Sequence, residues 1–340
     1  SDRGLAYGAR GDADKALADF DHSLKLDPRN ALALYNRALT LRNRGDLDRA
    51  IADFDGAIKL NPNYTVALYA RGNAHLSKRD LDRAIADLDQ AIKLDPNLGA
   101  AYADRAAAYG MKGDTDRALA DFDQAIKRDP KDALAYSNRG FAWRRKGDMA
   151  RAAADYEQAI KLDAGNASAF YNRGNAYYEK RDFDRAIADF DQALKINPAY
   201  AAALYNRGLA LRDKGDLDRA IADFGKVAQL EPKNAQAFTA LGLAYRSKGD
   251  LDRALAGFEQ AVRLDPGMAT AFGGRGATFG MKGDLDRAIA DLDQSVKLNP
   301  DDPRAFHNRG LAWRNKGDFG RSIADFDQAI KLDPKYATAL

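Results

Sequence analysis

The sequence has no cysteine among its 340 residues, which excludes disulfides, thiolate metal sites and cysteine nucleophiles. It also lacks an excess of charge of one sign, since 53 Lys and Arg stand against 50 Asp and Glu. No general attraction to nucleic acid or to a membrane surface therefore follows. No segment approaches the roughly 18 apolar residues that are needed to span a bilayer, so we expect no membrane insertion.

The sequence is equally poor in motifs that carry chemistry. The three histidines, His22, His75 and His307, occupy unrelated phases of the repeat described below, so they cannot form one metal cluster unless the chain folds back on itself. Asp-x-Asp runs such as Asp46 with Asp48 lack the central glycine and final glutamate of a calcium loop. There is no phosphate-binding loop. We expect no metal, no cofactor and no enzymatic activity.

What the sequence does have is an internal period of 34 residues. GDLDRAIADFDGAIKLNP begins at Gly45, and close copies begin at Arg181 and Gly317. Ten copies tile the chain, so we expect residues 1–340 to form a single array. The full copies start near residues 31, 65, 99, 133, 167, 201, 235, 269 and 303, with a truncated first copy at 1–30 and a four-residue remnant at 337–340.

Each copy is predicted to form two helices. In the copy that starts at Ala201, apolar or small residues recur at helical spacing, Lys214-Gly215-Asp216 interrupts them, and the spacing then resumes. Lysine followed by glycine is typical of a helix end, and aspartate before a new apolar run is typical of an N-cap. This aspartate is present in all ten copies, from Asp12 to Asp318, and nine of the ten prolines lie where they can end the second helix.

The pattern resembles the tetratricopeptide repeat family over the whole chain. The resemblance rests on the length of the repeat, a small residue at its eighth position (Gly72), an aromatic at the eleventh (Trp143), alanine at the twentieth (Ala50), an aromatic at the twenty-fourth (Phe54) and the proline. It implies an all-α, right-handed α-solenoid of stacked antiparallel helix pairs. In such a superhelix the first helices line a concave groove and the second helices form the convex face.

One departure from the family concerns charge. The seventh position is arginine in nine of the ten copies, where the family usually has an apolar residue, and the twenty-third position is aspartate in the same nine. The remaining copy has Leu241 and Gly257. An aspartate such as Asp53 could instead pair with Arg49 in its own helix, but Arg253 is kept where Gly257 replaces the acid. We therefore predict structural ion pairs that join the two helices of a repeat.

The candidate binding residues lie on the first-helix stripe that faces the groove in the family. Tyrosine and asparagine there supply contact area and amide hydrogen bonds to a peptide backbone, and arginine forks suit carboxylates. The candidates are Tyr35, Asn36, Arg42, Tyr69, Asn73, Asn138, Arg144, Arg145, Tyr171, Asn172, Asn175, Tyr178, Tyr205, Asn206, Arg212, Arg246, His307, Asn308 and Arg314. Together they favour an extended, acidic polypeptide as the ligand.

The asparagines at the sixth position are similar to the ladder in the repeat superhelix of O-linked N-acetylglucosamine transferases, which implies a grip on the peptide main chain. Ala70, Asp104, Ala240 and Gly274 interrupt the series. Solvated or locally hydrogen-bonded asparagines are the alternative. A carboxylate clamp of the chaperone type is disfavoured because its lysine at the fifth position is missing throughout.

Two copies differ from the rest, one with Ala107, Gly110 and Met111 and the other with Ala277 and its neighbours Gly280 and Met281. They are 170 residues apart, which favours a duplication of five repeats. Low-walled pockets that accept bulky side chains are one interpretation. Helices loosened by glycine, without a function, are the other.

The sequence thus predicts a scaffold or adaptor that binds protein or peptide. The alternative is a targeting or regulatory module of an enzyme whose catalytic domain lies outside this chain, since Ser1-Asp2-Arg3 suggests a cut within a larger protein. RNA binding is disfavoured by the near-zero net charge. Uncapped terminal repeats also suggest end-to-end self-association. The compartment stays open, with the cytoplasm favoured.

Overall fold

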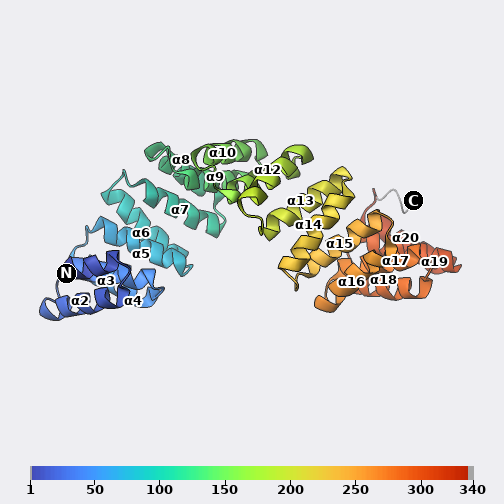
Figure 1. Cartoon of the computed structure of the whole chain (residues 1–340), viewed down its shortest axis with the longest axis horizontal. Coiled ribbons are helices and arrows are strands. Elements are labelled where there is room, and N and C mark those ends of the chain that lie inside the picture. The colour runs from blue at the N-terminus through green and yellow to red at the C-terminus, as the bar shows by residue number, and fades with distance from the viewer. Residues whose placement is uncertain (1, 336–340) are drawn as a thin grey trace. The chain divides into compact units, whose positions relative to one another are not determined.

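The computed structural model describes residues 2–335, and these form twenty α-helices joined by short turns, without a β-strand in this range. The chain divides into two compact units, residues 1–165 and 166–340. Each unit is described by itself, and each is a row of helix pairs (Figure 1). The remnant predicted at 337–340 lies outside the described residues.

In the N-terminal unit, every odd-numbered helix is the first of its repeat and every even-numbered helix is the second. The helices are α1 (Asp2–Ala9), α2 (Ala13–Leu26), α3 (Ala31–Asn43), α4 (Leu47–Leu60), α5 (Thr65–Ser77), α6 (Leu81–Leu94), α7 (Gly99–Lys112), α8 (Thr115–Arg128), α9 (Ala133–Arg145) and α10 (Met149–Leu162).

The C-terminal unit has the same alternation. Its helices are α11 (Ala167–Glu179), α12 (Phe183–Ile196), α13 (Ala201–Lys214), α14 (Leu217–Leu230), α15 (Ala235–Ser247), α16 (Leu251–Leu264), α17 (Ala269–Met281), α18 (Leu285–Leu298), α19 (Pro303–Lys316) and α20 (Phe319–Leu332). The first helices of the full copies therefore begin at the starts that the sequence period predicts.

The second helices begin at the predicted aspartate caps. Asp148, for example, accepts a hydrogen bond from the backbone N–H of Arg151 at 3.0 Å, which satisfies one of the free donors of α10. Asp12 departs from the prediction because its side chain makes no capping hydrogen bond. The turn before each cap has a left-handed residue, and this is glycine in most copies, as at Gly45, where φ is +83°.

The core of each repeat is formed by the small residue at the eighth position and the aromatic or leucine at the twenty-fourth. Gly208 of α13 lies so close to Phe224 of α14 that a Cβ atom would be 2.7 Å from the ring. Phe224 is fully buried, together with Ala220 one turn earlier. Glycine at the eighth position thus lets the ring of the second helix reach the backbone of the first.

Contacts between repeats are not the same on the two faces. Each second helix packs against its own first helix and against the first helix of the next repeat, as α4 does with α3 and α5. Consecutive first helices also touch each other, as in the pairs α3 with α5 and α15 with α17, whereas contacts between consecutive second helices are weaker or absent in the described range. The first helices therefore share one continuous face within each unit. None of the described helices has the length and hydropathy of a membrane span.

Candidate binding surface

The arginines at the seventh position join three helices. In α13, the Nε and Nη2 atoms of Arg207 donate to the carboxylate of Asp223 in α14 at 2.8 and 2.6 Å. The Nη1 atom donates to Asp191, in the second helix of the preceding repeat, at 2.6 Å. These hydrogen bonds raise the pKa of the Arg207 guanidinium above its ordinary value, although burial opposes them. The predicted pair between the two helices of a repeat is confirmed.

The same forked pair recurs along the chain, and so does its third member. The bond to the preceding repeat is present at Arg37–Asp21, Arg71–Asp55, Arg105–Asp89, Arg139–Asp123 and Arg309–Asp293. The alternative pairing within the second helix is not seen, because the arginine at the nineteenth position, such as Arg151, lies next to the cap residue Asp148 instead. Each network therefore fastens a repeat to its predecessor.

The repeat without this arginine has lost all three members. Leu241 replaces the arginine, Gly257 replaces the aspartate of the same repeat, and Gly225 stands where the preceding repeat would supply its acid. Leu241 packs instead against a core cluster that contains Phe224 and Ala240. The sequence analysis missed the third member, although an acid at the twenty-fifth position in the other nine copies was a visible signal.

The tyrosines at the fifth position are half-buried, whereas we expected exposed side chains. The ring of Tyr35 lies 6.0 Å from that of Phe54 and 5.2 Å from that of Tyr64. Tyr171 and Tyr205 pack in the same way against the aromatic residues of their second helices. The expectation failed because the fifth position is one turn from the core and a large ring reaches back to it. Burial also raises the pKa of Tyr69 to about 12.

The asparagines do not form one open ladder. Asn36 and Asn175 are only 7% and 6% exposed, which corrects the expectation of accessible amides at these two positions. Asn206 donates to Asn175 at 2.7 Å and to the hydroxyl of Tyr171 at 3.1 Å, so the alternative of local hydrogen bonding holds for this residue. The remaining asparagine candidates are half-buried, namely Asn73, Asn138, Asn172 and Asn308.

The arginines of the stripe differ from those of the networks in their partners. No carboxylate of the described residues lies within 4.0 Å of Arg42, Arg145, Arg246 or Arg314. Arg145 donates to the carbonyl of Gly110 at 2.6 Å, and Arg246 lies 3.4 Å from the carbonyl of Gly274. Arg212 is an exception, since it pairs with Asp213 at 2.7 Å. Burial lowers the pKa of Arg246 below its ordinary value.

The candidate residues come together in local groups within each unit. Arg42 and Asn73 lie near Tyr69, next to the buried carboxyl of Asp104. In the C-terminal unit, Tyr178 donates to Asp213 at 2.8 Å, beside Arg212 and Tyr205. His307 packs against Phe326, with Arg314 nearby. The stripe thus is a connected surface inside each unit, with one acid, Asp104, that we did not place among the candidates.

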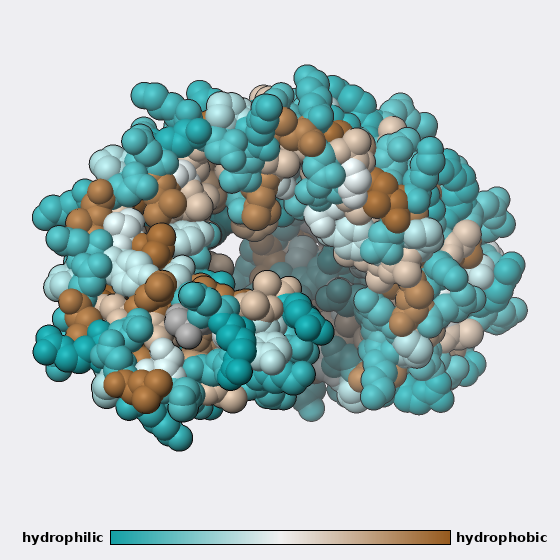
Figure 2. Space-filling view, turned by 60° about the vertical axis from the view of Figure 1, so that its left-hand side comes forward, coloured by the Kyte–Doolittle hydropathy of each residue, from teal (hydrophilic) through white to brown (hydrophobic). Residues whose placement is uncertain are grey.

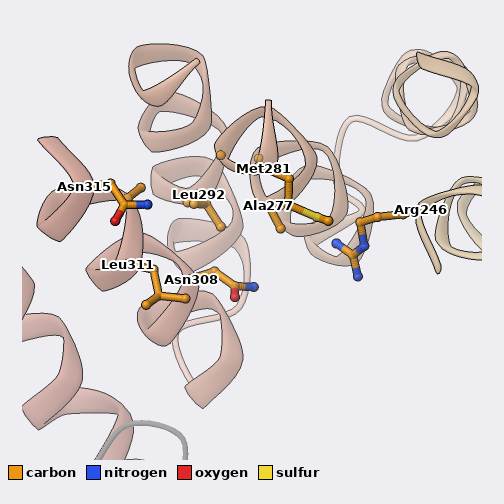
Figure 3. A pocket seen from close by; sticks show the side chains of 10 residues that line it. Arg246, Ala277, Met281, Leu292, Asn308, Leu311 and Asn315 are labelled. Atoms are coloured by element: carbon orange, nitrogen blue, oxygen red, sulfur yellow. The ribbon is translucent and has the colours of Figure 1, made fainter. Parts of the chain in front are cut away.

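Two pockets open on this surface where the sequence departs from the other copies. The first has a volume of about 430 Å³, and its wall includes Arg246, Ala277, Met281 and Asn308. Figure 3 shows the guanidinium of Arg246 on one side and the amide of Asn308 on another, with Ala277 and Met281 between the two helices. The second pocket, about 310 Å³, lies at the corresponding place beside Met111.

Apolar residues on the outside of the molecule are scattered. The face in Figure 2 is dominated by hydrophilic residues, with hydrophobic residues in small separate patches. Exposed examples are Phe141, Met111 and Met281, which lie in or beside the pockets. The pockets therefore provide local apolar contact area within a mainly polar surface.

Known structures share this architecture. A tetratricopeptide repeat protein from Parabacteroides merdae ATCC 43184 is 22% identical, with a TM-score of 0.59 over 71% of this chain and 95% of that one. The Cut9–Hcn1 hetero-tetramer of the APC/C gives 14% identity and a TM-score of 0.56 over 99% and 87% of the two chains. PilF of Pseudomonas aeruginosa gives 20% identity and a TM-score of 0.54 over 61% and 94%. These likenesses show the fold. No curated protein matches the sequence significantly.

Family models cover most of the sequence. A tetratricopeptide repeat model matches residues 1–65, 171–235, 209–269 and 280–337. Related repeat models match residues 65–98, 99–132 and 142–181. Arrays of this kind are protein-interaction scaffolds whose fold is typically non-catalytic, because stacked repeats offer extended binding surfaces. With helix pairs at the same period throughout the described residues, the chain belongs to the tetratricopeptide repeat family.

Proposed function

We propose that the shared face of the first helices binds extended, acidic segments of other proteins. The observation that carries the proposal is the contrast between two sets of arginines. Those at the seventh position are neutralised by one or two carboxylates each, as Arg207 is by Asp223 and Asp191. Those on the stripe, such as Arg42 and Arg145, have no carboxylate of the described residues in reach. A partner's carboxylates would complete them.

The rest of the stripe supports the same ligand. Half-buried tyrosine rings such as Tyr35 and Tyr69 are held in place by the core, so a ligand that packs on them immobilises little additional side chain. Half-buried asparagine amides, such as that of Asn138, can both donate to and accept from an extended peptide backbone. A folded acidic surface would not reach amides that are set among tyrosine rings, so an extended segment fits better.

Fluorescence anisotropy with labelled 12-residue peptides, one rich in aspartate and glutamate and one rich in lysine, tests the proposal. The acidic peptide should bind, and its affinity should fall as salt is raised. Arg42→Glu with Arg145→Glu should weaken binding at least tenfold. The control is Lys93→Glu with Lys127→Glu, which makes the same change in net charge at exposed residues of second helices. Equal losses in both variants would show that only net charge matters and would overturn the proposal.

A further inference from the structure

Three cavities of the described residues share one register of the repeat. They measure about 430, 310 and 390 Å³, a size typical of ligand pockets. Each has glycine at the twelfth position of a first helix and asparagine at the sixth position of the next repeat. The pairs are Gly280 with Asn308, Gly110 with Asn138, and Gly8 with Asn36. The other copies carry arginine, leucine or tyrosine at the twelfth position.

Packing does not require these glycines. A Cβ atom on Gly110 or Gly8 would meet nothing within 4 Å, and one on Gly280 would only touch Ala288 at 3.8 Å. Neither backbone strain nor a close helix approach explains them, in contrast to Gly208 against Phe224. Since glycine inside a helix lowers its stability relative to alanine, their visible effect is the space that they leave on the binding face.

The polar groups around this space lack partners. The Nδ2 atom of Asn36 is buried and has no hydrogen-bond partner in the described part of the chain. Arg246, on the wall of the largest pocket, also lines a smaller neighbouring one and has no carboxylate within 4.0 Å in residues 2–335. A buried donor and a half-buried cation without an anion are both costly, and both costs would fall if a ligand supplied a carbonyl or a carboxylate.

The floor of the pocket is apolar. In the largest pocket it includes Ala277, Leu292 and Leu311, and Met281, at 61% exposure, forms a movable rim. In the second pocket Phe122 and Phe141 take the places of the two leucines. Unbranched methionine adapts to side chains of different shape. The chemistry of the site is therefore an apolar hole with an amide and a guanidinium at its edge.

We propose that the pocket between α15, α17 and α19 holds an apolar side chain of a peptide whose neighbouring residue is acidic, with the acid on Arg246 and the peptide backbone on Asn308. The proposal rests on the proposed function, because it assigns one anchoring point to the same ligand. The pocket beside Met111 takes the same apolar side chain without this acid contact, since Leu76 stands at the position that corresponds to Arg246.

The four methionines make a site-specific test possible. Met281 and Met111 line the two pockets, whereas Met149 and Met268 do not. The protein is labelled at the methionine methyl groups with ¹³C and titrated with end-blocked nine-residue peptides. These contain Asp-Leu-Asp, Asp-Ala-Asp or Lys-Leu-Lys in a glycine and serine background. The Asp-Leu-Asp peptide should shift the Met281 signal most, and Met149 and Met268 should not shift.

Two variants locate the response. Gly280→Leu should fill the largest pocket without harm to folding, so the Met281 response should disappear while that of Met111 stays. Arg246→Leu, which copies Leu76, should remove the preference of Met281 for aspartate over lysine by at least fivefold and leave Met111 unchanged. Binding of Asp-Leu-Asp, detected by anisotropy, without a Met281 shift would overturn this inference and leave the proposed function standing. Absence of binding by every acidic peptide would overturn both.

Discussion

Arg207 and Asp191 belong to different repeats, and the Nη1 atom of the first donates to the carboxylate of the second over 2.6 Å. Together with the forked pair to Asp223, this contact makes one guanidinium serve three helices. The arginine is therefore part of the internal frame of the array. Its charge does not contribute to the binding face in the way that Arg42 or Arg145 can.

Removal of this arginine should leave two carboxylates without a cation. Arg207→Leu is expected to destabilise the C-terminal unit by about 3 kcal/mol, because Asp223 stays buried and charged. The double variant Arg207→Leu with Asp223→Gly copies the natural pair Leu241 and Gly257, so it should lose less. Urea unfolding followed by circular dichroism measures both. Equal losses in the single and double variants would contradict the ion-pair interpretation.

A second, exposed contact between repeats serves as the comparison. Lys214 pairs with Asp184 of the preceding repeat, and both side chains are largely in water. Such surface pairs contribute about 0.5 kcal/mol, so Lys214→Ala should change the urea midpoint far less than Arg207→Leu does. A loss as large as that of Arg207→Leu would mean that burial is not what makes the arginine networks strong.

Helix capping gives a matched pair of substitutions within one unit. Asp148 caps α10 through the N–H of Arg151, and its replacement by alanine should cost about 1 kcal/mol. Asp12 occupies the same position before α2 but makes no capping bond, so Asp12→Ala should cost less. Thermal unfolding of the two variants measures the difference. A larger loss for Asp12→Ala would show that the cap geometry does not determine the effect.

Two turns hold an arginine where the other copies have glycine. Arg79 and Arg181 both have φ of +59°, a left-handed conformation that side chains disfavour. Arg79→Gly should therefore raise stability by about 0.5 kcal/mol, because the relief of strain outweighs the greater freedom of glycine in the unfolded chain. The reverse change at an equivalent turn, Gly113→Arg, should lower the melting temperature. A decrease for Arg79→Gly would refute the strain argument.

The buried acid of the binding face should make stability depend on pH. Burial raises the pKa of Asp104 above its ordinary value of 3.8, and hydrogen bonds from Tyr69 and Asn73 oppose the rise. A carboxyl group with a raised pKa stabilises the fold below its unfolded pKa, and this contribution is lost as the pH rises through the folded pKa. Asp104→Asn should thus raise the melting temperature at pH 7, with a difference that shrinks below pH 3.8. The exposed Asp95→Asn controls for the loss of one charge, and an equal rise there would contradict the argument.

The sequence predicted the frame well because the frame is periodic. Helix starts, caps and the Arg–Asp pairs repeat every 34 residues, so ten copies reinforce one interpretation. It predicted the surface less well. Whether Tyr35 faces water or turns toward Phe54, and whether Asn206 bonds to Asn175, depends on helix crossing and side-chain direction, which a one-dimensional pattern does not contain. The pockets beside Met111 and Met281 were within reach because glycine marks both.

The junction between α14 and α15 differs in kind from its neighbours. Gly225, Leu241 and Gly257 leave it without an ionisable group at the three positions that fasten the other networks, and Leu241 packs on apolar side chains instead. Acid or concentrated salt weakens contacts made by carboxylates and spares those made by hydrocarbon. Under such conditions the C-terminal unit would come apart from its ionic seams first, and this pair of repeats would be the last to separate.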